Sequence, residues 1–123
     1  MILKILEKKC YLYKLDENRE IPKDIYRSSF FSVTKTDMDL SIICDLDIDM
    51  ACCLKHDDLR LIQLMTDGDL SDSKELRGIT DDLESQNILF NVVSTFNSEF
   101  LIFKSLEFDK AIEMFKYKNM KYS

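Results

Sequence analysis

The side chains that could carry out chemistry in this sequence are few and scattered. The one histidine, His56, lies between Lys55 and Asp57 at the edge of an apolar run. A nucleophile pair needs a serine, cysteine or second histidine beside it, and none lies nearby in the sequence. We therefore interpret His56 as a solvated residue at a strand boundary, while a pairing made through space stays open.

An acidic run is the first candidate for a metal site. The residues Asp45-Leu46-Asp47-Ile48-Asp49 begin like the calcium-binding loop of an EF-hand. Met50 then replaces the glycine that makes the sharp turn of such a loop, and His56 stands where the bidentate glutamate should be. The sequence favours a solvated acidic loop over a calcium site.

A second acidic cluster opens a predicted helix and consists of Asp67, Asp69, Asp72 and Glu75. Carboxylates in a first helical turn cap backbone N–H groups and interact favourably with the helix dipole. This structural role is sufficient to explain the cluster. A ligand-binding role stays open because of the family resemblance described below.

The cysteines and glycines argue against redox, metal and nucleotide chemistry. The spacing of Cys10, Cys44, Cys52 and Cys53 contains no C-x-x-C pair, so buried small apolar residues are favoured over a metal or redox site. Only two glycines are present, and no glycine-rich phosphate loop or H-E-x-x-H motif occurs. We expect no cofactor, no metal, no catalytic residue and no enzymatic activity.

Composition limits the partners and the compartment. The 123 residues carry a net charge of −6, with a pI near 4.8, which disfavours nucleic acid and anionic membranes because both attract positive charge. No run approaches the roughly 18 apolar residues of a membrane helix. Residues 1–6 are too short for the apolar part of a signal peptide, so we expect a cytoplasmic protein with reduced thiols.

The elements that position these residues are short apolar segments. In the first half, residues 2–6 and 10–15 are predicted strands, separated by a charged turn at 7–9. The β-branched and aromatic segments 30–36 and 40–44 predict a hairpin.

In the second half, residues 59–65 predict a strand that ends in a turn containing Gly68. Leu76, Ile79 and Leu83 then recur with the period of an amphipathic helix. Strands at 88–93 and 100–103 and a helix across 108–115 follow, which is most of a ferredoxin-like βαββαβ unit. The predicted core contains Leu61, Leu64, Leu76, Ile79, Leu83, Phe90, Val92, Leu101, Phe103, Ala111, Ile112 and Phe115.

Two segments resemble the hallmarks of a family of small ACT-like proteins. Residues 30–44, FFSVTKTDMDLSIIC, resemble the family pattern FFSVTRT-x-[DE]-LS-[IV]-[IV]-C. Residues 88–102, ILFNVVSTFNSEFLI, resemble its second pattern, IS-x-x-x-[IV]-ST-[FY]-x-[ST]-[DE]-[FY]-[IL]-[LV]. The family is similar to the regulatory domains of aspartate kinases and to the cytosolic arginine sensors of the TOR pathway.

The resemblance implies an α+β protein of two tandem ferredoxin-like (βαββαβ) ACT-type units. The first unit, residues 1–57, is degenerate, and the second spans residues 58–123. The implied function is non-catalytic: a regulatory module binds a free amino acid at the first strand-to-helix turn of the second unit, where helix N–H groups meet a carboxylate. By position, the implied ligand-binding residues are Met65, Thr66, Asp67, Gly68, Asp69, Ser71, Ser73, Ser94 and Thr95.

Charge around this turn narrows the ligand class. Lys74 and Glu75 stand where relatives have a small residue followed by apolar residues. The acidic cluster would repel a second carboxylate by about 1 kcal/mol for each pair of charges about 4 Å apart in water. We therefore expect a cationic or neutral amino acid rather than an acidic one. The alternative is an ACT-like protein-interaction module that has lost its ligand, and in either case we expect a homodimer.

Overall fold

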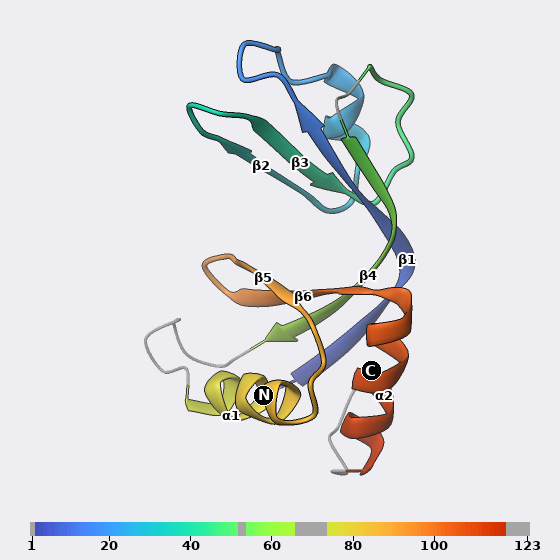
Figure 1. The fold of residues 1–123 in the computed structure, drawn as a ribbon, viewed down its shortest axis with the longest axis vertical. Helices are drawn as coiled ribbons and strands as arrows, with labels where there is room; N and C mark the ends of the chain where they lie inside the picture. The colour runs from blue at the N-terminus through green and yellow to red at the C-terminus, as the bar shows by residue number, and fades with distance from the viewer. Residues whose placement is uncertain (1, 52–53, 66–73, 118–123) are drawn as a thin grey trace. The chain divides into compact units, whose positions relative to one another are not determined.

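The computed structural model describes residues 2–51, 54–65 and 74–117 (Figure 1). The elements, in chain order, are β1 (Ile2–Leu15), the 3-10 helix η1 (Lys23–Arg27), β2 (Phe31–Lys35), β3 (Leu40–Cys44), β4 (Leu54–Met65), α1 (Lys74–Ser85), β5 (Asn91–Ser94), β6 (Ser98–Lys104) and α2 (Ser105–Tyr117). Among these residues, no helix is both long enough and apolar enough to cross a membrane.

The six strands belong to one sheet with the order β2-β3-β1-β4-β6-β5. The sheet is mostly antiparallel. Strand β3 pairs antiparallel with β1 and with β2, so that Ile42 lies opposite both Tyr13 and Val33. Strands β5 and β6 form an antiparallel hairpin in which Ser94 lies opposite Glu99.

The chain divides into two compact units, and two strands belong to both. One unit contains residues 1–7 and 60–123, and the other contains residues 8–59. Strands β1 and β4 each continue through a boundary between the units (Figure 1). The predicted charged turn at residues 7–9 is therefore wrong, because Lys8 and Lys9 lie within β1 with exposed side chains. A strand accepts charged residues where they face solvent.

The predicted fold, two tandem ferredoxin-like ACT-type units with the first one degenerate, is also wrong. The structure is instead a mostly antiparallel sheet with two α-helices. Strand β1 is a continuous element of 14 residues where the prediction placed two strands joined by a turn. Strands from both halves of the chain belong to one sheet. The halves are therefore not separate βαββαβ repeats.

The larger core lies in the unit that contains both α-helices. Ile62 and Leu64 of β4 and Leu101 and Phe103 of β6 alternate along their strands and are buried. The helices pack against them through the buried residues Ile79, Leu83, Phe108, Ala111, Met114 and Phe115.

The predicted core is confirmed except at one position. Leu76, Phe90 and Ile112 are partly buried against this cluster, and Leu61 is buried. The prediction is wrong for Val92, because 42% of the surface of this residue is exposed. It lies on β5, the last strand of the sheet order, so it has a strand neighbour on one side only among the described residues.

Helix α1 ends through a backbone feature that the hydrophobic pattern does not reveal. Asn87 has a positive φ of 58°. The N–H of Ile88 donates to the carbonyl of Leu83 at 3.0 Å, and the N–H of Asn87 donates to Glu84 at 3.0 Å. Asparagine tolerates this left-handed conformation, which satisfies carbonyls at a helix end. The turn directs the chain from α1 into the segment before β5.

The second core belongs to the unit without an α-helix. Its buried residues are Tyr13, Leu15, Ile25, Leu40, Ile42, Cys44 and Ile48. Ile25 comes from η1, which begins directly after Pro22, a residue whose fixed φ suits the start of a helical turn. One short helical turn therefore closes this core where the other unit uses two full helices.

We expect Leu83→Ala to lower the free energy of unfolding by about 2–5 kcal/mol, because it leaves a cavity beneath α1. Leu83 is completely buried. Leu106→Ala is the matched control, since Leu106 lies on α2 and is 77% exposed. Urea unfolding of both variants measures the difference. Equal losses for the two, or a loss below about 0.5 kcal/mol for Leu83→Ala, would contradict the packing of α1.

Candidate functional site

Three of the predicted ligand-binding residues fall among the described residues. Met65 is the last residue of β4, and Ser94 and Thr95 lie at the turn between β5 and β6. The remaining predictions, Thr66, Asp67, Gly68, Asp69, Ser71 and Ser73, lie outside the described residues. The described part of the candidate site is therefore the turn of the β5–β6 hairpin.

The hairpin is closed by hydrogen bonds between Thr95 and Ser98. The N–H of Thr95 donates to the Ser98 carbonyl at 2.8 Å. The Thr95 hydroxyl donates to the same carbonyl at 3.1 Å and accepts from the Ser98 N–H at 3.0 Å. A threonine side chain that satisfies its own turn in this way fixes the turn geometry. Thr95 therefore positions the strand ends on either side of it.

The strand ends hold a buried carboxylate. Glu99 is 5% exposed, and Ser94 donates a hydrogen bond from Oγ to Glu99 Oε2 at 2.5 Å. Because the two residues lie directly opposite in the antiparallel register, their side chains share one face of the sheet. Ser94 itself is exposed. The pair therefore lies where the buried interior of this unit meets solvent.

Strand alternation defines which face this is. Glu99, Leu101 and Phe103 alternate on β6, and Leu101 and Phe103 belong to the core that both helices cover. The carboxylate is therefore on the helix-covered face of the sheet. Burying a charged group costs several kcal/mol unless the group is paired or hydrogen-bonded.

A second polar pair lies on the opposite face of the sheet and joins β6 to β4. Gln63 of β4 donates from Nε2 to the Ser98 hydroxyl at 3.0 Å, and Ser98 is 7% exposed. Gln63 alternates with the core residues Ile62 and Leu64. This contact fixes the end of β6 against β4, so the strand that carries Glu99 is held on both of its sides.

Glu99 is the site residue that the sequence prediction missed. Glu99 is the acidic residue of a family pattern, yet the implied ligand residues stopped at Thr95. A signal was present in the residues themselves, because Glu99 directly precedes Phe100-Leu101-Ile102-Phe103. A carboxylate that begins an otherwise apolar strand is a candidate for burial and for a specific partner.

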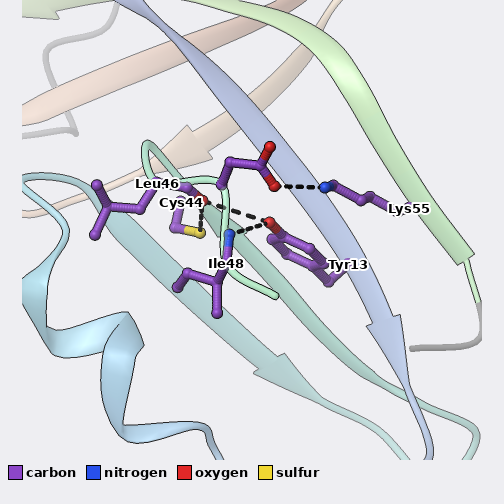
Figure 2. Close-up of polar contacts among 6 residues, drawn as sticks. Tyr13, Cys44, Leu46, Ile48 and Lys55 are labelled. Atoms are coloured by element: carbon purple, nitrogen blue, oxygen red, sulfur yellow. Dashed lines mark hydrogen bonds and ion pairs between the residues drawn. The ribbon is translucent and has the colours of Figure 1, made fainter. Parts of the chain in front are cut away.

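A separate polar cluster lies in the other unit and is centred on Tyr13 (Figure 2). The Tyr13 hydroxyl accepts a hydrogen bond from the Ile48 N–H at 2.8 Å and donates to the Leu46 carbonyl at 3.4 Å. The Cys44 thiol donates to the same carbonyl at 3.3 Å. These contacts tie the loop after β3 to β1.

Lys55 is the positively charged member of this cluster and contacts an acidic residue and two tyrosine rings. Its ammonium lies 2.5 Å from Asp47 Oδ1 and 5.4 Å from the ring centroids of both Tyr11 and Tyr13. The hydrogen bond that Lys55 donates to Asp47 raises the pKa of Lys55, and burial raises the pKa values of Tyr13 and Cys44. Lys55 therefore stays charged, and Tyr13 and Cys44 stay protonated, at neutral pH. Tyr13 and Cys44 therefore act as hydrogen-bond donors and Lys55 as a cation, and none of the three loses its proton near neutral pH.

The acidic run is part of this structural cluster. Asp47 pairs with Lys55, and Asp45 Oδ1 accepts from the Ser29 N–H at 3.1 Å. His56 lies within β4 with an exposed side chain. In the described part of the chain, no three histidine, cysteine, aspartate or glutamate side chains are grouped so that they could hold a metal ion.

The cysteine prediction is confirmed for Cys10 and Cys44, which are both buried. Cys52 and Cys53 lie outside the described residues.

Known proteins resemble this chain in part of its sequence and in its fold. A family profile described as an N-terminal domain matches residues 12–48, which is less than half of the chain. A search of curated proteins finds no match.

Solved structures share the fold at low sequence identity. A structural genomics target from Agrobacterium tumefaciens superposes with a TM-score of 0.81 at 22% identity, covering 99% of this chain and 91% of that chain. A Vibrio cholerae protein of unknown function, described as a possible transport protein, gives a TM-score of 0.66 at 10% identity, with 90% and 84% covered.

A third structure is described as a candidate C-terminal regulatory domain of aspartate kinase from Porphyromonas gingivalis. It gives a TM-score of 0.56 at 13% identity, covering 90% of this chain and 89% of that chain. The resemblance to aspartate kinase regulatory domains is therefore supported by this one structure, and only as a likeness of fold.

We expect Tyr13→Phe to destabilise the protein by about 1–3 kcal/mol, because the buried Ile48 N–H loses its acceptor. Tyr26→Phe is the control that removes the same hydroxyl from a residue that is 62% exposed, and it should cost less than about 0.5 kcal/mol. Urea unfolding at neutral pH gives both values. Equal effects would show that the Tyr13 hydroxyl does not hold the loop.

Proposed function

We propose that this chain is a non-catalytic regulatory module that binds a free amino acid beside the turn of the β5–β6 hairpin, with the Glu99 carboxylate receiving a positive charge of the ligand. The observation that carries the proposal is the burial of Glu99 at the start of an apolar strand, next to the exposed Ser94 hydroxyl. Ser94 and Thr95 are among the residues that the sequence resemblance assigns to ligand binding.

The chemistry of Glu99 favours a cation. A hydroxyl donor offsets part of the cost of burying a carboxylate, but a positively charged donor makes a shorter and about twice as strong hydrogen bond. An ammonium or guanidinium group that reaches Glu99 past Ser94 would therefore gain the larger interaction. A second carboxylate in the same place would be repelled. The ligand class that fits is a cationic or neutral amino acid rather than an acidic one.

The regulatory part of the proposal rests on the similarity to a protein described as an aspartate kinase regulatory domain. A module of this kind works by binding its ligand more tightly in one state than in another. Of the groups at the hairpin turn, the Ser94 hydroxyl contacts Glu99 directly, while Thr95 and the Gln63–Ser98 pair hold the strand ends in place. The proposal assigns this chain no reaction, no cofactor and no metal, and it places the chain in the cytoplasm.

The alternative function is a protein-interaction module that has lost its ligand. It is favoured by two exposed apolar residues, Val92 of β5, which is 42% exposed, and Phe96 of the turn after β5, which is 82% exposed. The two functions are distinguishable because ligand binding depends on the carboxylate of Glu99, and pairing with another chain does not.

We expect a cationic or neutral amino acid to raise the melting temperature by roughly 3–8 °C at ten times its dissociation constant, which corresponds to about 1.4 kcal/mol. Glu99→Gln should remove this shift relative to its own unliganded midpoint, because the amide keeps the shape and loses the charge. A thermal-shift screen of the twenty amino acids measures both.

Glu84→Gln is the control, since it removes the same charge from an exposed position on α1 and should leave the shift unchanged. An undiminished shift in Glu99→Gln would remove Glu99 from the site. If millimolar amino acids leave the wild-type midpoint unchanged, the interaction-module function replaces amino-acid binding.

A further inference from the structure

Arg60 is a partly buried cation that lacks a partner of opposite charge in the described part of the chain. It lies on β4, and its Nε is buried and forms no hydrogen bond with any described residue. No carboxylate within residues 2–51, 54–65 and 74–117 forms an ion pair with its guanidinium group. A charged group that has lost water without gaining an acceptor costs free energy, so its presence in a folded protein needs an explanation.

Two exposed cations provide a contrast. Arg27 pairs with Asp24 at 3.5 Å, and Lys110 pairs with Glu107 at 3.4 Å, although both cations are well exposed to water. Ion pairs at such positions contribute little, because water already hydrates the charges. Arg60 is less hydrated than either cation, and an acceptor would therefore stabilise it more.

The ring of Phe108 holds the guanidinium group of Arg60 in one place. The central carbon of this group, Cζ, lies 4.4 Å from the centroid of the ring. Phe108 is a buried residue of α2 and meets Phe103 of β6 edge to face, with ring centroids 6.3 Å apart. An arginine over an aromatic ring keeps its N–H donors for other partners. The ring therefore positions the cation without using its hydrogen-bonding capacity.

The terminal nitrogens of Arg60 are the donors that a ligand can reach. Of the three guanidinium nitrogens, only Nε is both buried and without a partner. The two terminal nitrogens form no hydrogen bond with the described residues either, so they keep access to solvent. Arg60 alternates with Ile62 and Leu64 of the larger core. The terminal donors therefore lie where this core meets solvent, beside α2.

We propose that Arg60 binds the carboxylate of a small organic acid, with its two terminal nitrogens donating to the two carboxylate oxygens. The planar fork of a guanidinium group matches a carboxylate in this bidentate arrangement, and a charge-assisted hydrogen bond is about twice as strong as a neutral one. The bound carboxylate supplies the negative charge that the described residues do not provide.

Charge selects the class of ligand. A carboxylate carries one negative charge, which a single guanidinium group neutralises. A phosphate group carries about −1.5 to −2 charges at neutral pH, and it would be left with uncompensated charge in a protein of net charge −6. An acidic protein or a nucleic acid would bring many more negative charges against the same field. A small monocarboxylate is therefore favoured.

NMR of the ¹H–¹⁵N signals from arginine Nε–H groups tests this proposal in the whole chain. The Arg60 signal is assigned by its loss in Arg60→Lys. Sodium acetate should move this signal to saturation at millimolar concentration, because the carboxylate binds the same guanidinium group. Sodium chloride and inorganic phosphate at equal ionic strength should each move it much less.

Arg27 is the matched control, because its guanidinium group is exposed and paired with Asp24, so its signal should not saturate with acetate. An Arg60 signal that does not saturate, an equal response to chloride, an equal response of Arg27, or stronger saturation by phosphate would each overturn the proposal. Glu99→Gln should leave the acetate response of Arg60 unchanged. The two proposals can therefore fail separately, and a lost response in that variant would contradict a separate carboxylate site.

Discussion

Two long strands, β1 and β4, are the constraint on which the rest of this structure depends. Each continues from one compact unit into the other. Strand β1 contributes Leu3 to one hydrophobic core and Tyr13 and Leu15 to the second. The side-chain alternation of a strand has a period of two, so a shift of register by one residue would turn the apolar residues away from their cores. Strand β1, which contributes to both cores, must therefore keep one side-chain alternation along its length.

Within one unit, this fixed sheet has to accommodate a buried carboxylate. Glu99 is the second residue of β6. Thr95 closes the turn before it, and Gln63 hydrogen-bonds to Ser98 on the opposite face of the sheet. In the other unit, Lys55 and Asp47 already pair with each other, and Tyr13 has both its donor and its acceptor function used. The contrast favours Glu99 as the group that receives an external charge and the Tyr13 cluster as a structural tie.

Local periodicity predicts much of this fold, because it depends on which residues face a core. Leu83 of α1 and Phe115 of α2 lie on buried helix faces as their spacing predicts. The order of strands depends on long-range pairing, which local periodicity does not show, so the tandem units implied by the family resemblance were predicted in place of one sheet. Val92 is apolar yet exposed, since β5 lies at an edge that composition does not reveal. Ser94 and Thr95 were predicted as ligand-binding residues, whereas Glu99 was not, although its place directly before an apolar run was a signal for burial.

The central claim, that Glu99 receives the positive charge of an amino acid, is tested most directly by the ¹³C resonance of its side-chain carboxyl carbon. The resonance is assigned by its loss in Glu99→Gln and followed during titration with cationic and neutral amino acids. The account predicts that the Glu99 signal moves to saturation while that of the exposed Glu84 does not. Saturable binding seen at backbone amides, with an unchanged Glu99 signal, would contradict it.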